Sequence, residues 1–176
     1  MRITLINPPK LFSVTNWATG PTIPPLGLAY IAASLNKTGH AVSVIDAVGE
    51  AIYEVEFYRH IGRGDYYLQG LSAKEVCGRI PGDTELIGFS CMFSPQWPVT
   101  ADLISQVRGR FPSVPIVIGG EHGSALPRYS LESSKANIVV MGEGEETIAE
   151  LVFALEREGP KALSTVTQPR FWCTMP

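Results

Sequence analysis

The sequence predicts an α/β protein built on one parallel β-sheet. Short β-branched runs alternate along the chain with longer segments of helical period, which is typical of successive βα units. Four of the five strand candidates are almost entirely apolar, as expected of parallel strands that helices cover on both faces. A chain of 176 residues is long enough for one such core but short for two ordinary domains.

The strand candidates share an apolar, β-branched composition and lie at residues 3–7, 41–46, 86–91, 116–118 and 138–141. Five strands with helices between them favour a flavodoxin-like, doubly wound sheet of order 2-1-3-4-5 in three α/β/α layers. Each strand is then expected to end at the same edge of the sheet, where such folds bind their ligands.

Start and stop signals mark the helices between these strands. Pro24-Pro25 and Gly39 bound the first, and Ser72 with Glu75 has the spacing of a capping box at the start of the second. Apolar periodicity predicts two more helices and a weaker short one, over residues 99–110, 145–158 and after Pro127.

Two segments have no clear pattern. Residues 49–71 form an aromatic and charged insertion in which no element can be placed. Residues 159–176 have no useful period and are expected to be a truncated linker or tail, so the domain itself is predicted to span residues 1–158.

Composition excludes several functions. A formal charge of −3 with scattered basic residues gives no positive field for nucleic acid, and no apolar run is long enough to span a membrane. The N-terminus has no signal peptide pattern. Three cysteines without C-x-x-C spacing suit a reducing compartment, so we expect a cytoplasmic protein.

Small residues follow three of the strands. They lie in SCMFSP (residues 90–95), GGEHGSALP (119–127) and MGEGEET (141–147). Glycine permits close approach of a ligand to the backbone, and a broad ligand would make use of all three strand ends. Ordinary turn chemistry is the alternative explanation for any one of these glycines.

These motifs carry a family resemblance. The ordered series INPP, PPLGLAYIAASLNKTGHAVSVIDA, IGFSCMFSP, PIVIGGEHGSALP and IVVMGEGEETIAELVFAL resembles the cobalamin-binding N-terminal domain of cobalamin-dependent radical S-adenosylmethionine enzymes. The resemblance covers about residues 1–158 and implies a corrinoid over the carboxyl edge of the sheet, with its nucleotide tail beside the third and fourth strands. The cofactor-binding residues that it implies are Pro9, Thr22, Ser90, Cys91, Met92, Ser94, Gly119, Gly120, Glu121, His122, Gly142, Glu143 and Gly144.

Two departures limit what the resemblance implies. Other cobalamin modules have D-x-H-x-x-G after the first strand, but this chain has NPPKLFSVTNWATG there, so no histidine is expected on the cobalt. The cysteine triplet C-x-x-x-C-x-x-C is also absent. S-adenosylmethionine and a [4Fe–4S] cluster would therefore belong to a missing or partner radical domain, in cis or in trans. The resemblance implies that the chain presents cobalamin to this domain for methyl transfer.

No residue is assigned a catalytic or metal-binding role. His122 is interpreted as structural, with its ring bonded to a loop or to the cofactor periphery, and His40 and His60 as solvated. Cys91 is interpreted as a small packed hydrophobe, and Glu143 and Glu145 as acids that complement the dipole of a helix.

Two other functions remain open. A degenerate module that has lost its cofactor would act as a scaffold or in protein contacts. A flavodoxin-like nucleotide or flavin binder is disfavoured, because the loop after the first strand lacks a run of hydroxyl residues and glycines to bind phosphate.

Overall fold

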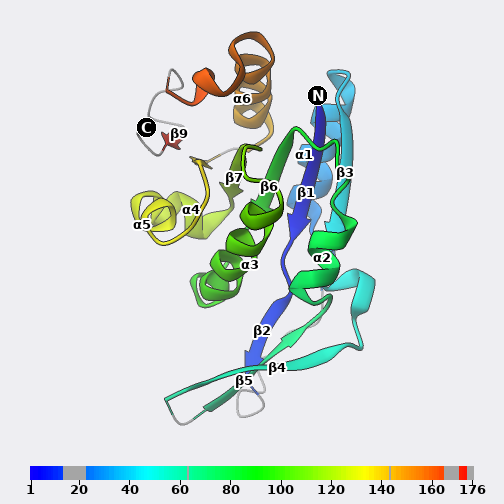
Figure 1. Cartoon of the computed structure of the whole chain (residues 1–176), viewed down its shortest axis with the longest axis vertical. Helices are drawn as coiled ribbons and strands as arrows, with labels where there is room; N and C mark the ends of the chain where they lie inside the picture. The colour runs from blue at the N-terminus through cyan, green and yellow to red at the C-terminus, as the bar shows by residue number, and fades with distance from the viewer. Residues whose placement is uncertain (14–22, 63, 143, 165–170, 174–176) are drawn as a thin grey trace.

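The computed structural model describes residues 1–13, 23–62, 64–142, 144–164 and 171–173. Its main sheet is formed by β1 (Arg2–Asn7), β3 (Ala41–Asp46), β6 (Leu86–Ser90), β7 (Ile116–Gly119), β8 (Ile138–Val140) and β9 (Phe171–Cys173). The strands lie in the order β3-β1-β6-β7-β8-β9 (Figure 1). The first five in this order are parallel, and β9 pairs antiparallel with β8.

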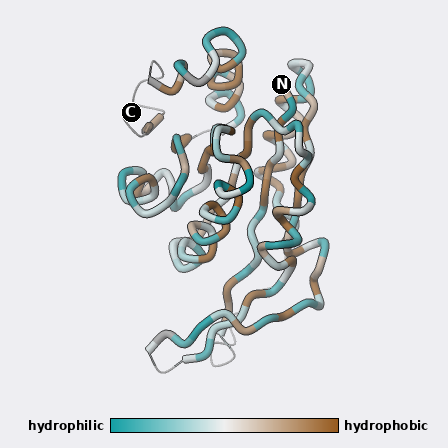
Figure 2. The backbone as a smooth tube through the Cα atoms, viewed as in Figure 1, coloured by the Kyte–Doolittle hydropathy of each residue, from teal (hydrophilic) through white to brown (hydrophobic). Residues whose placement is uncertain are grey.

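Helices cover both faces of this sheet, which confirms the predicted layered α/β architecture. They are α1 (Leu26–Lys37), α2 (Ala73–Arg79), α3 (Trp97–Arg110), α4 (Glu121–Ala125), α5 (Pro127–Glu132) and α6 (Gly144–Glu158). Leu5 belongs to the core beneath α1 and α6, and Ile6 to the core beneath α2 and α3, as the two-residue period of a strand requires. Hydrophobic residues accordingly concentrate along the central strands (Figure 2).

The helix signals in the sequence correspond to real helix ends. In α2 the Ser72 hydroxyl accepts a hydrogen bond from the Glu75 amide at 3.3 Å, and the Glu75 carboxylate accepts one from the Ser72 amide at 2.9 Å. This is the predicted capping box. The five-residue helix α4 was not predicted, because one turn carries almost no periodicity. None of the helices in the described ranges is long and apolar enough to cross a membrane.

The insertion at residues 49–71 contains a β-hairpin that the sequence analysis could not place. Strands β4 (Val55–Ile61) and β5 (Gly64–Gln69) pair with each other and with β2 (Lys10–Ser13) in an antiparallel sheet of order β2-β5-β4, which we call the arm. The arm extends beyond the carboxyl end of β1 (Figure 1). The side-chain amide of Gln96 fastens it to the body, because it accepts from the Leu11 amide at 2.7 Å and donates to the Leu11 carbonyl at 2.9 Å.

The chain after Glu158 also contains structure that the sequence did not predict. A 3-10 helix, η3 (Gly159–Ser164), and strand β9 follow α6. Ala162 and Phe171 are buried in the core beneath α1 and α6. The described part of residues 159–176 therefore packs on the fold, while the domain boundary at residue 158 stays a prediction.

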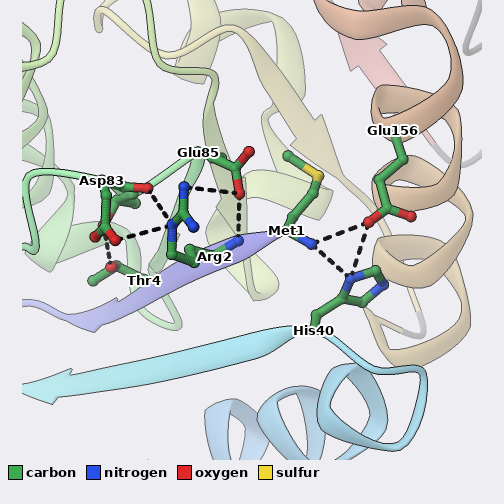
Figure 3. A network of polar contacts seen from close by, with 8 residues as sticks. Met1, Arg2, Thr4, His40, Asp83, Glu85 and Glu156 are labelled. Atoms are coloured by element: carbon green, nitrogen blue, oxygen red, sulfur yellow. Dashed lines mark hydrogen bonds and ion pairs between the residues drawn. The ribbon is translucent and has the colours of Figure 1, made fainter.

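The amino edge of the sheet is tied together by charged groups (Figure 3). The amino group of Met1 lies 3.0 Å from the Glu156 carboxylate and 3.2 Å from Nδ1 of His40. The interpretation of His40 as solvated is wrong, because its side chain is enclosed by the start of β1 and by α6 and is only 9% exposed. His60, in the arm, is exposed as expected.

Candidate functional site

The loops after β6, β7 and β8 meet at the carboxyl edge of the sheet. We call residues 90–94, 119–124 and 141–142 the rim. The Cys91 amide donates to the Gly119 carbonyl at 2.8 Å, and the His122 amide donates to the Cys91 carbonyl at 3.1 Å. The Gly142 amide donates to the hydroxyl of Ser124 at 3.2 Å. These bonds bring together the three segments of small residues that the sequence analysis singled out.

The two glycines at the end of β7 are small for different reasons. A Cβ on Gly119 would meet no atom within 4 Å, so open space lies next to this residue. Gly120 has a φ of 101°, and a Cβ there would lie 2.6 Å from the carbonyl oxygen of Cys91. Its lack of a side chain is thus dictated by the chain's own turn. The chain's own packing therefore explains the glycine at position 120 and does not explain the one at position 119.

Three large apolar side chains are exposed in the loops at this edge of the sheet. Met92 is 51% exposed and Phe93 is 70% exposed, both in the loop after β6, and Leu126 at the end of α4 is 45% exposed. Contiguous exposed apolar side chains are typical of surfaces that bind another molecule, whereas single ones are common on any protein. The rim therefore combines an open backbone position at Gly119 with the exposed apolar side chains of Met92 and Phe93.

The predicted site residues differ in how they are presented. Ser94 and Glu121 are exposed, Ser90 is half-buried and pairs with Gly119 across β6 and β7, and Gly142 is exposed. Pro9 is buried between β1 and β2, two residues before Leu11, which bonds to Gln96. Gly144 lies against α1, where an added Cβ would be 3.3 Å from Ile31. Thr22 and Glu143 lie outside the described residues.

Cys91 and His122 belong to the rim, but their side chains are buried and do not reach its surface. Cys91 is 2% exposed, its thiol donates to the Phe93 carbonyl at 3.7 Å, and burial raises the pKa of the thiol. A protonated, enclosed thiol is a poor nucleophile, in agreement with its interpretation as a packed hydrophobe. His122 is equally buried, and burial lowers the pKa of its imidazole. Neither side chain is placed to touch a molecule above the rim.

Two side chains, one that holds the rim together and one that holds the arm, were not singled out by the sequence analysis. Ser124 bridges two rim segments through its bond to Gly142, and Gln96 fixes the arm. The signal for Ser124 was available, since it lies within GGEHGSALP. Nothing in the sequence around Gln96 indicates that its partner is Leu11, because the two residues are 85 positions apart.

A separate groove follows the carboxyl end of β3. It has a volume of about 580 Å³ and is lined by residues 49–56, 70–72, 75 and 79. Arg79 and Glu50 form an ion pair at 3.3 Å within its lining. The lining includes none of the predicted site residues.

Comparisons with known proteins identify the domain type. Residues 80–152 match the B12 binding domain family. The chain is 31% identical over 125 residues to cytidylyl-2-hydroxyethylphosphonate methyltransferase of Streptomyces wedmorensis, covering 70% of this chain and 23% of that protein. It is 30% identical over 161 residues to anaerobic magnesium-protoporphyrin IX monomethyl ester cyclase of Synechocystis, covering 89% of this chain and 28% of that protein. The chain therefore spans about a quarter of the length of these relatives.

Solved structures agree in fold. The radical S-adenosylmethionine methyltransferase TsrM of Kitasatospora setae superposes with a TM-score of 0.63 at 19% identity, covering 89% of this chain and 26% of TsrM. The cobalamin-dependent radical enzyme OxsB, solved with aqua-cobalamin bound, gives the same TM-score and identity and covers 89% of this chain and 19% of OxsB. The resemblance read from the sequence motifs is confirmed: residues 80–152 match the B12 binding domain, and the chain has the fold of the corresponding region of these radical S-adenosylmethionine enzymes.

Proposed function

We propose that this chain binds cobalamin over the rim and presents it to a radical S-adenosylmethionine catalytic domain for methyl transfer. Cobalamin supplies a cobalt centre that can carry a methyl group. The chain's own residues would bind and orient that cofactor and exclude water from it. The proposal is supported by the match of residues 80–152 to the B12 binding domain and by the chemistry of the rim.

The observation that carries the proposal is the open space at Gly119. A wide ligand with an apolar ring face and a polar periphery needs a bare backbone to approach and apolar side chains to cover that face. Gly119 provides the first, and Met92 and Phe93 provide the second. Ser90 and Ser94 add hydroxyls that can bond to polar groups on the ligand periphery.

We propose further that no histidine of this chain coordinates the cobalt. The chain has three histidines, and none of them lies exposed on the rim. His40 is at the amino edge of the sheet, His60 is in the arm, and His122 is buried with its Nδ1 bonded to Ser94. This placement agrees with the lack of D-x-H-x-x-G after β1.

The catalytic partner is inferred from what this chain lacks in sequence. Its cysteines, at positions 77, 91 and 173, do not have the spacing that holds a [4Fe–4S] cluster. S-adenosylmethionine and the cluster would then be supplied by a radical domain, in cis or in trans. Of the two relatives described above, one is a methyltransferase and the other is a cyclase. Methyl transfer is proposed here because of the similarity to the methyltransferase.

Reconstitution with hydroxocobalamin tests the proposal. The 176-residue chain is incubated with the corrinoid, desalted, and its visible spectrum recorded. We expect one corrinoid per chain, with a spectrum that lacks nitrogen coordination from the protein. A folded but colourless protein would favour the cofactor-free scaffold instead.

A pair of glycine variants adds a matched control. Gly119→Phe fills the open space at the rim and should abolish corrinoid retention. Gly109→Phe places the same ring at the C-terminal end of α3, where an added Cβ also meets nothing within 4 Å. This variant should retain the corrinoid. Equal retention by both variants would place the corrinoid elsewhere.

A further inference from the structure

His122 is a buried polar side chain with only one of its two ring nitrogens satisfied. The residue is 2% exposed, and its ring stacks on the indole of Trp97 with centroids 4.6 Å apart and planes inclined by 26°. Nδ1 lies 2.9 Å from the hydroxyl oxygen of Ser94. Nε2 is buried and has no hydrogen-bond partner among the described residues.

The neighbouring residues hold the ring in this orientation. The Trp97 indole N–H donates to the Ser133 hydroxyl at 3.0 Å, which fixes the plane on which His122 stacks. The His122 amide donates to the Cys91 carbonyl at 3.1 Å, so its backbone is tied to the loop that carries Ser94. The imidazole cannot turn to find a second partner without losing one of these contacts.

The unpartnered nitrogen identifies the tautomer. A neutral imidazole has one N–H donor and one acceptor nitrogen. If Ser94 donated to Nδ1, the proton would be on Nε2, which would leave an N–H buried without an acceptor, and such orphaned donors are rare. With the proton on Nδ1, His122 donates to the Ser94 oxygen and only a lone pair is left unsatisfied. The second arrangement is favoured.

This tautomer determines what Ser94 can do. A hydroxyl has one proton and two acceptor positions. Because the Ser94 oxygen already accepts from His122, its own proton is free to be donated, and the Ser94 side chain is exposed at the rim. The same arrangement excludes His122 as a general base for Ser94, because its Nδ1 already carries a proton.

We propose that His122 is a positioning residue that holds Ser94 as a hydrogen-bond donor to an acceptor oxygen of the molecule bound over the rim. On the proposed function, on which this inference rests, the acceptor is an amide carbonyl on the corrinoid periphery. His122 itself does not contact the ligand. The lowered pKa of its imidazole, caused by burial, keeps the ring neutral in this arrangement.

Nitrogen-15 NMR of the histidine rings tests the tautomer without any ligand. The His122 signals are assigned by their loss in His122→Phe, a variant that keeps an aromatic ring on Trp97 but has no donor. We expect a protonated Nδ1 and an unprotonated Nε2 at neutral pH. A proton on Nε2 would overturn the inference directly.

Hydroxocobalamin titrations test the consequence for binding. Loss of one neutral hydrogen bond should weaken affinity about two- to tenfold in Ser94→Ala. His122→Phe should weaken it by a similar factor, and the double variant should be no worse than Ser94→Ala, because His122 acts through Ser94. His60→Phe, at an exposed position in the arm, should bind as the wild type does.

Each outcome has a distinct meaning. Wild-type affinity in Ser94→Ala, or losses that multiply in the double variant, would overturn the role of His122 while leaving cobalamin binding intact. Failure of the wild type to retain any corrinoid would overturn the proposed function, and this inference with it. If circular dichroism shows that His122→Phe does not fold, His122→Asn replaces it, because asparagine keeps an N–H donor near the position of Nδ1. His122→Asn should then bind hydroxocobalamin within twofold of the wild-type affinity. A loss of affinity as large as that of Ser94→Ala would count against the inference.

Discussion

Replacing Gly120 by alanine should destabilise the fold, whereas the same change at Gly119 should not. Gly120 has φ 101° and ψ 175°, a region of backbone space that is almost exclusive to glycine. Its added Cβ would lie 2.6 Å from the oxygen and 2.9 Å from the carbon of the Cys91 carbonyl. Both are backbone atoms, so no side-chain rotation can relieve the contact.

The size of the effect follows from two contributions. The unfavourable φ costs on the order of 1–3 kcal/mol. Relieving the contact requires the turn after β7 to move away from Cys91, and this breaks the 3.1 Å bond from the His122 amide, at a further cost of about 1 kcal/mol. The free energy of unfolding should therefore fall by about 2–4 kcal/mol, a large part of the 5–15 kcal/mol typical of a domain.

Urea denaturation followed by circular dichroism measures this loss. With a slope of about 2 kcal/mol per molar urea, the midpoint of Gly120→Ala should fall by about 1–2 M. Gly119→Ala should leave the midpoint unchanged or raise it slightly, because alanine fits there and restricts the unfolded chain. A wild-type midpoint for Gly120→Ala, or a marked loss for Gly119→Ala, would refute the assignment of these two glycines.

Three further outcomes are expected. Gln96→Ala removes both bonds to Leu11, so hydrogen exchange at the Leu11 amide should become at least tenfold faster in mass spectrometry or NMR, and an unchanged rate would show that the arm is held elsewhere. Phe93→Ser should change the free energy of unfolding by less than about 0.5 kcal/mol yet weaken hydroxocobalamin binding, because Phe93 is exposed at the rim. Burial lowers the pKa of His122, so as the pH is lowered the imidazole is protonated in the unfolded state before it is protonated in the folded state. The free energy of unfolding should therefore fall as the pH drops below the ordinary histidine pKa of 6.5, and the urea midpoints of His122→Asn should lack this part of the pH dependence.

The parallel sheet was predictable because its signals are local. Each strand is a short apolar run, and the strands are separated by helices with their own end signals. Ser72 and Glu75 are three residues apart, so a capping box can be recognised from the sequence and forms as predicted. Such features depend on neighbours along the chain, and periodicity reports them well.

The arm could not be predicted because its stability depends on distant pairing. β2 pairs with β5 through residues more than 50 positions apart, such as Phe12 and Tyr67. Phe12, Tyr67 and Phe57 lie in one row across the arm, with neighbouring ring centroids 5.9 and 5.8 Å apart. In the sequence of residues 49–71 the aromatic residues show no regular spacing. The partner strand β2, next to Pro9, has only four residues and is too short to be recognised from the sequence.

The rim shows a subtler limit of sequence reasoning. Gly119 and Gly120 are adjacent and identical in chemistry, and a single explanation, a ligand passing over both, accounted for the pair. The conformation of the backbone separates them, since only Gly120 has a positive φ and a carbonyl in the way of a side chain. A similar division applies to the residues that the sequence predicts to contact the cofactor. His122 and Ser94 were assigned to the same surface, but the buried imidazole bonds to the exposed hydroxyl from below. On the proposed function, fewer residues of GGEHGSALP would face the cofactor than the motif suggests, because Gly120, His122 and Ser124 hold the rim itself together.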